Sequence, residues 1–152
     1  IQHAIYFYNY AQQPWKTQEK IRYVLDELYG IGADGYCGDE DNGQTSAWFL
    51  FSAMGFYPVA PVTGEYVIGS PLFKSVEITL PNKKNIFIDA KNNSKENIFV
   101  NALQVESEIY SKNYINHNDL ENGARIYFDM SSKPNYKWGS SKESVPYSMT
   151  NK

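Results

Sequence analysis

The chain has 152 residues, a length typical of one domain or of two very small ones, and 42% of these residues are hydrophobic, which is enough for a core. The net charge of −3 and the lack of any Lys/Arg block argue against nucleic acid as a partner. No apolar run reaches the roughly 18 residues of a membrane span, and one cysteine with two histidines is too few for a Cys/His metal site.

The first part of the chain has helical spacing. Residues 3–11 are predicted to end a helix, which Pro14 breaks. Thr17 is the expected N-cap of a second helix, and Gly30 is its expected C-cap. The one-sided apolar stripe of this second helix comprises Ile21, Val24, Leu25 and Leu28.

A third helix is predicted after a glycine-rich acidic loop at residues 31–45. Thr45 or Ser46 is expected to cap this helix, which runs to about Met54 and ends at Gly55. The helix is apolar nearly all round, so we expect it to be buried on most sides, by neighbours that this short chain does not supply. For the same reason, Trp48 is predicted to be a core residue rather than a platform for sugar.

From about residue 57 the spacing becomes strand-like, with turns rich in Asn and Gly. Short strands at this spacing favour an antiparallel sheet or sandwich, so the fold class is predicted to be α+β. The predicted strands are 65–68, 75–80, 85–90, 97–101, 103–106, 108–110 and 125–129.

Three consecutive carboxylates, Asp39, Glu40 and Asp41, stand in the glycine-flanked loop before the apolar helix. Crowded carboxylates hold their charges only with a cation, a hydrogen-bond network or a polar substrate nearby, which favours a catalytic or binding site. The alternative is a helix start, where the helix dipole favours acids. An EF-hand calcium loop does not match, because its sixth and twelfth positions would be Gln44 and Leu50.

The spacing of Asp39 and Asp41 suits a shared task. Two carboxylates on one loop can together orient and deprotonate one water molecule, but a general acid on the other side of a sugar must come from elsewhere. A nucleophilic Cys37 is the less favoured alternative, because only two histidines could activate it. His3 is distant in sequence, and His117 lies in a polar stretch typical of a turn or sheet edge.

Long motifs in this chain resemble glycoside hydrolase family 92, a family of calcium-dependent, exo-acting α-mannosidases that invert the anomeric configuration. The resemblance rests first on residues 37–48 (CGDEDNGQTSAW) and 51–59 (FSAMGFYPV). It is supported by residues 8–18 and 64–73, and by positions between 114 and 135. It implies that residues 1–56 are the last helices of an (α/α)6 barrel and that residues 57–152 form a C-terminal antiparallel β region.

The resemblance also implies site residues. Asp41 matches the general base, Asp39 matches its partner aspartate, and Gln2 matches a position that helps to bind Ca²⁺. The catalytic glutamate and the other calcium ligands of the family match positions upstream of Ile1. His3, Glu40 and Trp15 are expected to contact substrate.

The resemblance implies a function and a location as well. The expected substrate is terminal α-linked mannose on glycans, with α-1,2 linkage favoured, and the expected location is extracellular or periplasmic. The missing N-terminal portion of the same protein would be a partner. The alternatives are a sugar-binding fragment and a purely structural one, neither active alone. One departure from the family is Gln12, where glycine is usual, so a local turn is expected to differ.

Overall fold

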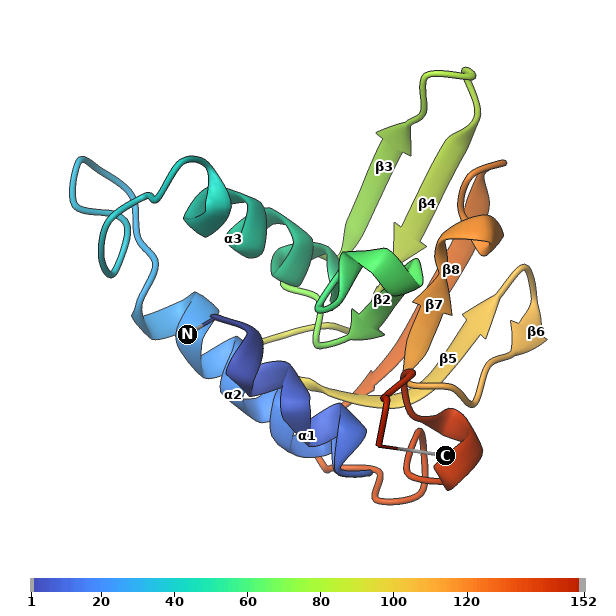
Figure 1. The fold of residues 1–152 in the computed structure, drawn as a ribbon. Coiled ribbons are helices and arrows are strands. Elements are labelled where there is room, and N and C mark those ends of the chain that lie inside the picture. The colour runs from blue at the N-terminus through green and yellow to red at the C-terminus, as the bar shows by residue number, and fades with distance from the viewer. Residues whose placement is uncertain (1, 151–152) are drawn as a thin grey trace.

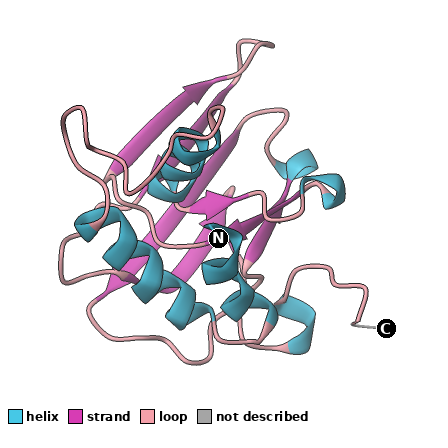
Figure 2. Ribbon diagram, turned by 60° about the vertical axis from the view of Figure 1, so that its left-hand side comes forward, coloured by secondary structure: helices cyan, strands magenta, loops and turns pink. Residues whose placement is uncertain are grey.

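The computed structural model describes residues 2–150 and has helices followed by two sheets (Figures 1 and 2). The α+β class is therefore confirmed. Within residues 2–150, no helix is long and apolar enough to cross a membrane. The α-helices are α1 (Phe7–Tyr10), α2 (Pro14–Glu27) and α3 (Gln44–Met54), and short 3-10 helices lie at Gln2–Tyr6, Pro61–Thr63, His117–Asp119 and Lys142–Ser144.

The turn between α1 and α2 shows why a glycine would suit this position, and it corrects one prediction. Gln12 has a φ of 61°, the left-handed conformation that glycine adopts most easily. Helix α2 begins at Pro14, whose fixed φ suits the first helical position, and Gln13 is its N-cap. The predicted Thr17 cap is therefore wrong. Thr17 is buried, and its hydroxyl donates to the carbonyl of Ile5 at 3.0 Å.

The ends of α2 and α3 follow local backbone requirements. Leu28 is the C-cap of α2, so the predicted Gly30 cap is wrong. Gly43 (φ 91°) precedes α3, and Gly55 (φ 105°) ends it, as predicted. Thr45 and Ser46 lie within the first turn of α3 instead of capping it, because the left-handed approach to the helix places its start at Gln44.

Two sheets follow the helices. The smaller sheet is antiparallel, with the strand order β1 (Phe56–Tyr57), β2 (Glu65–Ile68) and β7 (Tyr114–Asn116). The larger sheet has the order β3-β4-β8-β5-β6, and it is mixed because β4 and β8 are parallel. Its strands are β3 (Ser75–Thr79), β4 (Asn85–Asp89), β8 (Ala124–Ser131), β5 (Phe99–Val105) and β6 (Glu108–Ile109).

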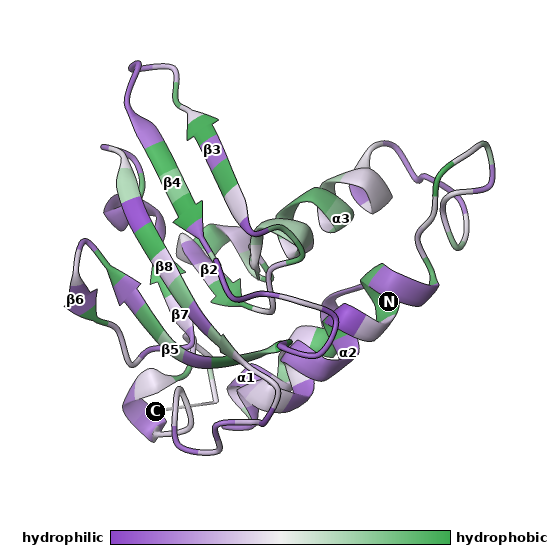
Figure 3. Ribbon diagram, turned by 180° about the vertical axis from the view of Figure 1, so that it is seen from behind, coloured by the Kyte–Doolittle hydropathy of each residue, from purple (hydrophilic) through white to green (hydrophobic). Residues whose placement is uncertain are grey.

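The sequence alternation accounts for the main core. In β8 the buried residues alternate with outward polar ones, and the alternation is visible as bands along the strand in Figure 3. The predicted strands 97–101 and 103–106 are one strand, β5, with an irregularity between Val100 and Ala102. A second apolar cluster joins the helices to the smaller sheet, and its buried members are Tyr6, Ile21, Leu25, Trp48, Tyr57 and Val67.

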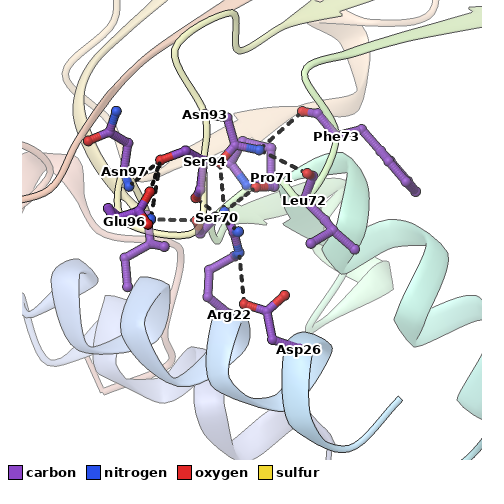
Figure 4. A network of polar contacts seen from close by, with 11 residues as sticks. Arg22, Asp26, Ser70, Pro71, Leu72, Phe73, Asn93, Ser94, Glu96 and Asn97 are labelled. Carbon is purple, nitrogen blue, oxygen red and sulfur yellow. Dashed lines mark hydrogen bonds and ion pairs between the residues drawn. The ribbon is translucent and has the colours of Figure 1, made fainter. Parts of the chain in front are cut away.

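Arg22 joins α2 to two loops of the β region (Figure 4). Its side chain is only 3% exposed, and its guanidinium donates to the carbonyl of Pro71 (3.0 Å), the side chain of Asn93 (2.6 Å) and the carbonyl of Ser94 (3.1 Å). Burial lowers the pKa of Arg22, and the nearby Asp26 carboxylate opposes that shift. Arg22 therefore satisfies carbonyls that the loops leave unpaired.

Three more buried amide side chains, those of Asn9, Gln18 and Asn113, link the helices to the β region. Asn9 donates to the carbonyls of Ile68 and Asn113, and Asn113 donates in return to the carbonyl of Asn9. Gln18 of α2 accepts a hydrogen bond from the backbone N–H of Val100 in β5 at 3.1 Å. Gln18 and Arg22 therefore hold α2 against the β region, whereas Asn9 holds α1 against it. The loop that follows α2 starts from this fixed support.

Candidate functional site

The acidic loop joins α2 to α3 and, in Figure 1, extends away from the rest of the chain beyond the ends of both helices. Its first half closes on itself, because the N–H of Gly30 donates to the carbonyl of Gly35 at 2.9 Å and the N–H of Gly35 donates to the carbonyl of Gly32 at 3.2 Å. A Cβ on Gly35 would overlap the carbonyl oxygen of Gly30, so only glycine fits there without a shift.

The second half of the loop carries the acids into α3 through three successive left-handed residues. Asp41, Asn42 and Gly43 have φ values of 56°, 58° and 91°. Asp and Asn tolerate this region better than most residues, and glycine tolerates it best, which explains the sequence Asp-Asn-Gly. The carboxylates of Asp39 and Asp41 belong to exposed residues.

Glu40 has a different role from its neighbours in this structure. Its carboxylate accepts hydrogen bonds from the N–H of Gly43 and from both the N–H and the hydroxyl of Ser46 at the start of α3. These hydrogen bonds lower the pKa of Glu40. The Ser46 hydroxyl makes the largest contribution, and the backbone N–H groups of Gly43 and Ser46 follow. Glu40 thus satisfies donors at the helix start, which is the role that the helix-start alternative predicted for an acid.

An open pocket of about 560 Å³ lies beside the acidic loop. It brings together Gln2, Asp39 and Asp41, three of the residues that the sequence predicted for catalysis and metal binding. The other residues that line it are Ile5, Val24, Tyr29, Cys37, Gly38, Thr45 and Trp48. Two residues that carry carboxylates and one that carries an amide therefore line one hollow, from the acidic loop and the N-terminal segment.

Hydrogen bonds tie Gln2 to both the loop and α3. The side-chain N–H of Gln2 donates to the Thr45 hydroxyl at 3.1 Å, and that hydroxyl donates to the carbonyl of Asp39 at 3.0 Å. The indole N–H of Trp48 donates to the carbonyl of Gln2 at 3.2 Å. The sequence predicts only a helix-cap role for Thr45, because its contacts with residues 2 and 39 are not local and leave no spacing signal.

Aromatic rings form the apolar side of this pocket. Trp48 is 1% exposed, which confirms it as a core residue, and Tyr29 stacks on it with ring centroids 5.7 Å apart. Burial, with Cys37 and Tyr36 nearby, raises the pKa of Tyr29 to about 12, so its hydroxyl keeps its proton at neutral pH. Tyr29 was not predicted as a site residue, since a tyrosine that follows a helix end carries no distinctive signal.

The structure does not bring the other predicted substrate residues to this pocket. The ring of His3 packs edge-on against Tyr57, with centroids 5.4 Å apart. Trp15 lies in the first turn of α2 instead of in a loop, and it packs against Tyr136 at 5.1 Å, at the opposite end of the helix from the acids. Their contacts with substrate therefore stay predictions for other parts of a bound glycan.

Cys37 and His117 occupy separate places. Cys37 is exposed and lines the acidic pocket, whereas no histidine of residues 2–150 lines it. His117 begins a short 3-10 helix directly after β7, as predicted for a turn residue, and its Nδ1 lies 3.1 Å from the Tyr66 hydroxyl. The arrangement therefore offers Cys37 no histidine base.

The donors at the pocket fit a hard cation in kind but not in number. Ca²⁺ takes six to eight oxygen ligands. Gln2 and the loop carboxylates supply oxygens of the right type, but the part of the chain that the structure describes has no group of three or more His, Cys, Asp or Glu residues placed to hold a metal ion. The residues that the structure describes therefore supply only part of a calcium ligand set.

Comparisons with known proteins agree with the geometry. Residues 1–132 match the model of the glycosyl hydrolase family 92 catalytic domain. The structure of the α-mannosidase BT3965 from Bacteroides thetaiotaomicron, in complex with mannoimidazole, is 43% identical and superposes with a TM-score of 0.94 over 97% of this chain and 20% of that one. The inverting mannosidase BT2199 from the same organism is 48% identical, with a TM-score of 0.93 over 98% of this chain and 20% of that one.

A more distant structure, that of the family hydrolase ccman5, is 21% identical with a TM-score of 0.91 over 99% of this chain and 24% of that one, which shows the fold alone. A comparison with curated proteins found no match. The chain spans about a fifth of the length of the two Bacteroides enzymes. The family match over most of the chain confirms the resemblance drawn from residues 37–48, and the chain belongs to glycosyl hydrolase family 92.

Proposed function

We propose that this chain is the C-terminal part of an inverting, calcium-dependent exo-α-mannosidase that removes terminal α-linked mannose, with α-1,2 linkage favoured, from glycans outside the cytoplasm. Family membership supports the proposal, as do the descriptions of the two Bacteroides relatives as mannosidases, one of them inverting. Because the chain spans about a fifth of each relative, the activity is proposed for a longer protein, in which residues 1–56 would be the last helices of the barrel.

One observation carries this proposal: Asp39 and Asp41 line the same pocket from a loop that is fixed at the start of α3. In the proposed reaction, the Asp41 carboxylate takes a proton from water while the water oxygen bonds to the anomeric carbon, and Asp39 orients the same water. The bond from that carbon to the leaving oxygen breaks, and a glutamate outside this chain protonates the leaving oxygen. Attack from the opposite face inverts the configuration.

Calcium is proposed as a cofactor of the longer protein only. Gln2 would supply one amide oxygen, and the remaining ligands would come from residues outside this chain, since the donors here are too few. His3 is proposed to line the extended site, and Glu40 is proposed to act on substrate only indirectly, by fixing the loop.

The test is Asp41→Asn in the full-length protein, compared with Asp34→Asn. Asp34 is an aspartate of the same loop that does not line the pocket. We expect Asp41→Asn to lower kcat by about 10²- to 10⁴-fold, the usual contribution of a general base, and Asp34→Asn to leave it within about twofold. Proton NMR of the first product formed should show β-mannose. Wild-type activity of Asp41→Asn would remove the assignment.

Exposed apolar side chains on the acidic loop and α3 suggest that other parts of the longer protein pack against this chain. Ile31 in the acidic loop is fully exposed, and Leu50 on α3 is 57% exposed. We propose that parts of the longer protein cover these side chains and that this chain alone releases no mannose. Mannose release by the isolated chain would contradict this, because it would require a general acid within these residues.

A further inference from the structure

Thr45 lies where the N-terminal segment, the acidic loop and α3 meet through side-chain hydrogen bonds at the pocket. It is 5% exposed and lies in the first turn of α3. Its hydroxyl bonds to Gln2 and to the backbone of Asp39 at 3.1 and 3.0 Å. Because both partners line the pocket that holds Asp41, the position of this hydroxyl affects the site without lying among the reacting groups.

The directions of these two hydrogen bonds are settled by their chemistry. The Asp39 carbonyl can only accept, so the single hydroxyl proton of Thr45 points to it. The hydroxyl can then only accept from the Gln2 side chain, which must present its N–H₂ group rather than its oxygen. Thr45 therefore selects one of the two orientations of the Gln2 amide, in which the amide oxygen does not bond to Thr45.

Helix α3 holds Gln2 at a second atom as well. Trp48, three positions after Thr45 on the same face of the helix, donates its indole N–H to the backbone carbonyl of Gln2 at 3.2 Å. The buried indole stacks on Tyr29, so this anchor is fixed in turn. Thr45 and Trp48 together fix both the backbone and the side chain of Gln2 relative to the loop that carries the acids.

We propose that Thr45 is a positioning residue of the reaction: its hydroxyl orients the Gln2 amide and sets the backbone of Asp39, and so aligns the Asp39–Asp41 pair with bound substrate. This inference rests on the proposed function. Small displacements of catalytic groups cost large factors in rate, about 10²-fold for about 1 Å. The loss of the hydroxyl should therefore act on kcat more than on KM.

The experiment uses the full-length protein with Thr45→Val, Thr45→Ser and the control Thr17→Val. Valine keeps the branched shape but removes the hydroxyl, whereas serine keeps the hydroxyl. Thr17 is a suitable buried threonine, because its hydroxyl also donates to a backbone carbonyl, that of Ile5, while Thr17 itself does not line the pocket and bonds to neither Gln2 nor Asp39. We expect Thr45→Val to lower kcat about 10- to 100-fold with KM within about threefold, and Thr45→Ser to recover most of the rate.

Thr17→Val should reduce the unfolding midpoint about as much as Thr45→Val and leave kcat unchanged. A kcat for Thr45→Val equal to that of Thr17→Val, or a Thr45→Ser rate as low as that of Thr45→Val, would overturn the proposal. If Thr45→Val does not fold, Thr45→Ala replaces it under the same criteria. Asp41→Asn separates the two ideas: full activity there removes the proposed function, whereas an inactive Asp41→Asn with unaffected Thr45 variants removes only this inference.

Discussion

The junction between α2 and the sheets and the acidic loop between α2 and α3 are built in opposite ways. At the junction, buried side chains such as Arg22 and Asn113 bond to backbone carbonyls of distant segments. In the loop, Asp39 and Asp41 are exposed, and glycines and left-handed residues set the path of the backbone. The two regions adjoin at the end of α2. They differ in burial and in what holds the backbone in place, although they are neighbours in the fold.

This difference teaches where stability and chemistry reside. A buried guanidinium that donates to three acceptors contributes strongly to the free energy of unfolding, because its loss leaves those acceptors unpaired. An exposed loop contributes little to the same quantity. Groups that must meet a polar substrate have to stay accessible, and they gain their precision from the rigid element that follows. Glu40, Thr45 and Ser46 form that connection, since they fix the loop to the first turn of α3.

Arg22→Met should have the largest effect on stability. It removes the donors to Pro71, Asn93 and Ser94 and leaves their oxygens unpaired in a buried place. We expect the free energy of unfolding to fall by about 3–5 kcal/mol in urea denaturation. Lys20→Met, an exposed change on the same helix, should stay within about 0.5 kcal/mol. If the two substitutions lowered the free energy of unfolding equally, the hydrogen bonds of Arg22 would contribute no more to stability than an exposed side chain does.

Gly35→Ala should separate activity from stability. The added Cβ overlaps the carbonyl of Gly30, so the loop must move, and we expect kcat of the full-length protein to fall about tenfold or more. The free energy of unfolding should change by about 1 kcal/mol or less, because the loop is exposed. Gly30→Ala is the matched control, since its Cβ would meet nothing within 4 Å. If Gly35→Ala greatly lowered the free energy of unfolding but kept full activity, the loop would serve stability rather than catalysis, contrary to this account.

Glu40 should show the smallest effect, as a pH dependence of the loop. Its folded pKa is lowered by Ser46 and Gly43, so the stabilisation is present above the unfolded pKa and is lost as the pH falls through the folded pKa. Carboxyl NMR titration should place the folded pKa below the usual glutamate value of about 4.3. Ser46→Ala should raise it again. An ordinary pKa in the wild-type protein would mean that the capping bonds do not hold in solution.

Local patterns predicted the features that depend on neighbours in sequence. The stripe of Ile21 and Leu25, the end of α3 at Gly55 and the strand 65–68 follow from periodicity and glycine geometry, and the structure has them. Strands β1 and β7 were not predicted, because two or three residues are too few to show an alternation. The parallel pairing of β4 with β8 joins segments far apart in the chain, so no local pattern indicates it.

The site divides in the same way. The cluster of Asp39, Glu40 and Asp41 was visible in the sequence. The family resemblance predicted that Gln2 belongs to the same site, and Gln2 lines the same pocket as Asp39 and Asp41. The sequence does not predict that Glu40, rather than Asp39 or Asp41, accepts hydrogen bonds from Gly43 and Ser46. Which carboxylate reaches these donors depends on the path of the loop, and three adjacent acids give no sign of it. The role of Thr45 was likewise hidden, since its partners are set by the tertiary fold.

The central claim is that Asp41 activates water, and the most direct measurement compares two substrates with the full-length Asp41→Asn variant. A dinitrophenyl α-mannoside has a leaving group that departs without a general acid, whereas an α-linked mannobiose needs one. Loss of a general base should lower kcat by a similar factor, about 10²-fold or more, on both substrates. Recovery of near wild-type rates on the dinitrophenyl substrate would contradict the account, because it would make Asp41 the acid rather than the base.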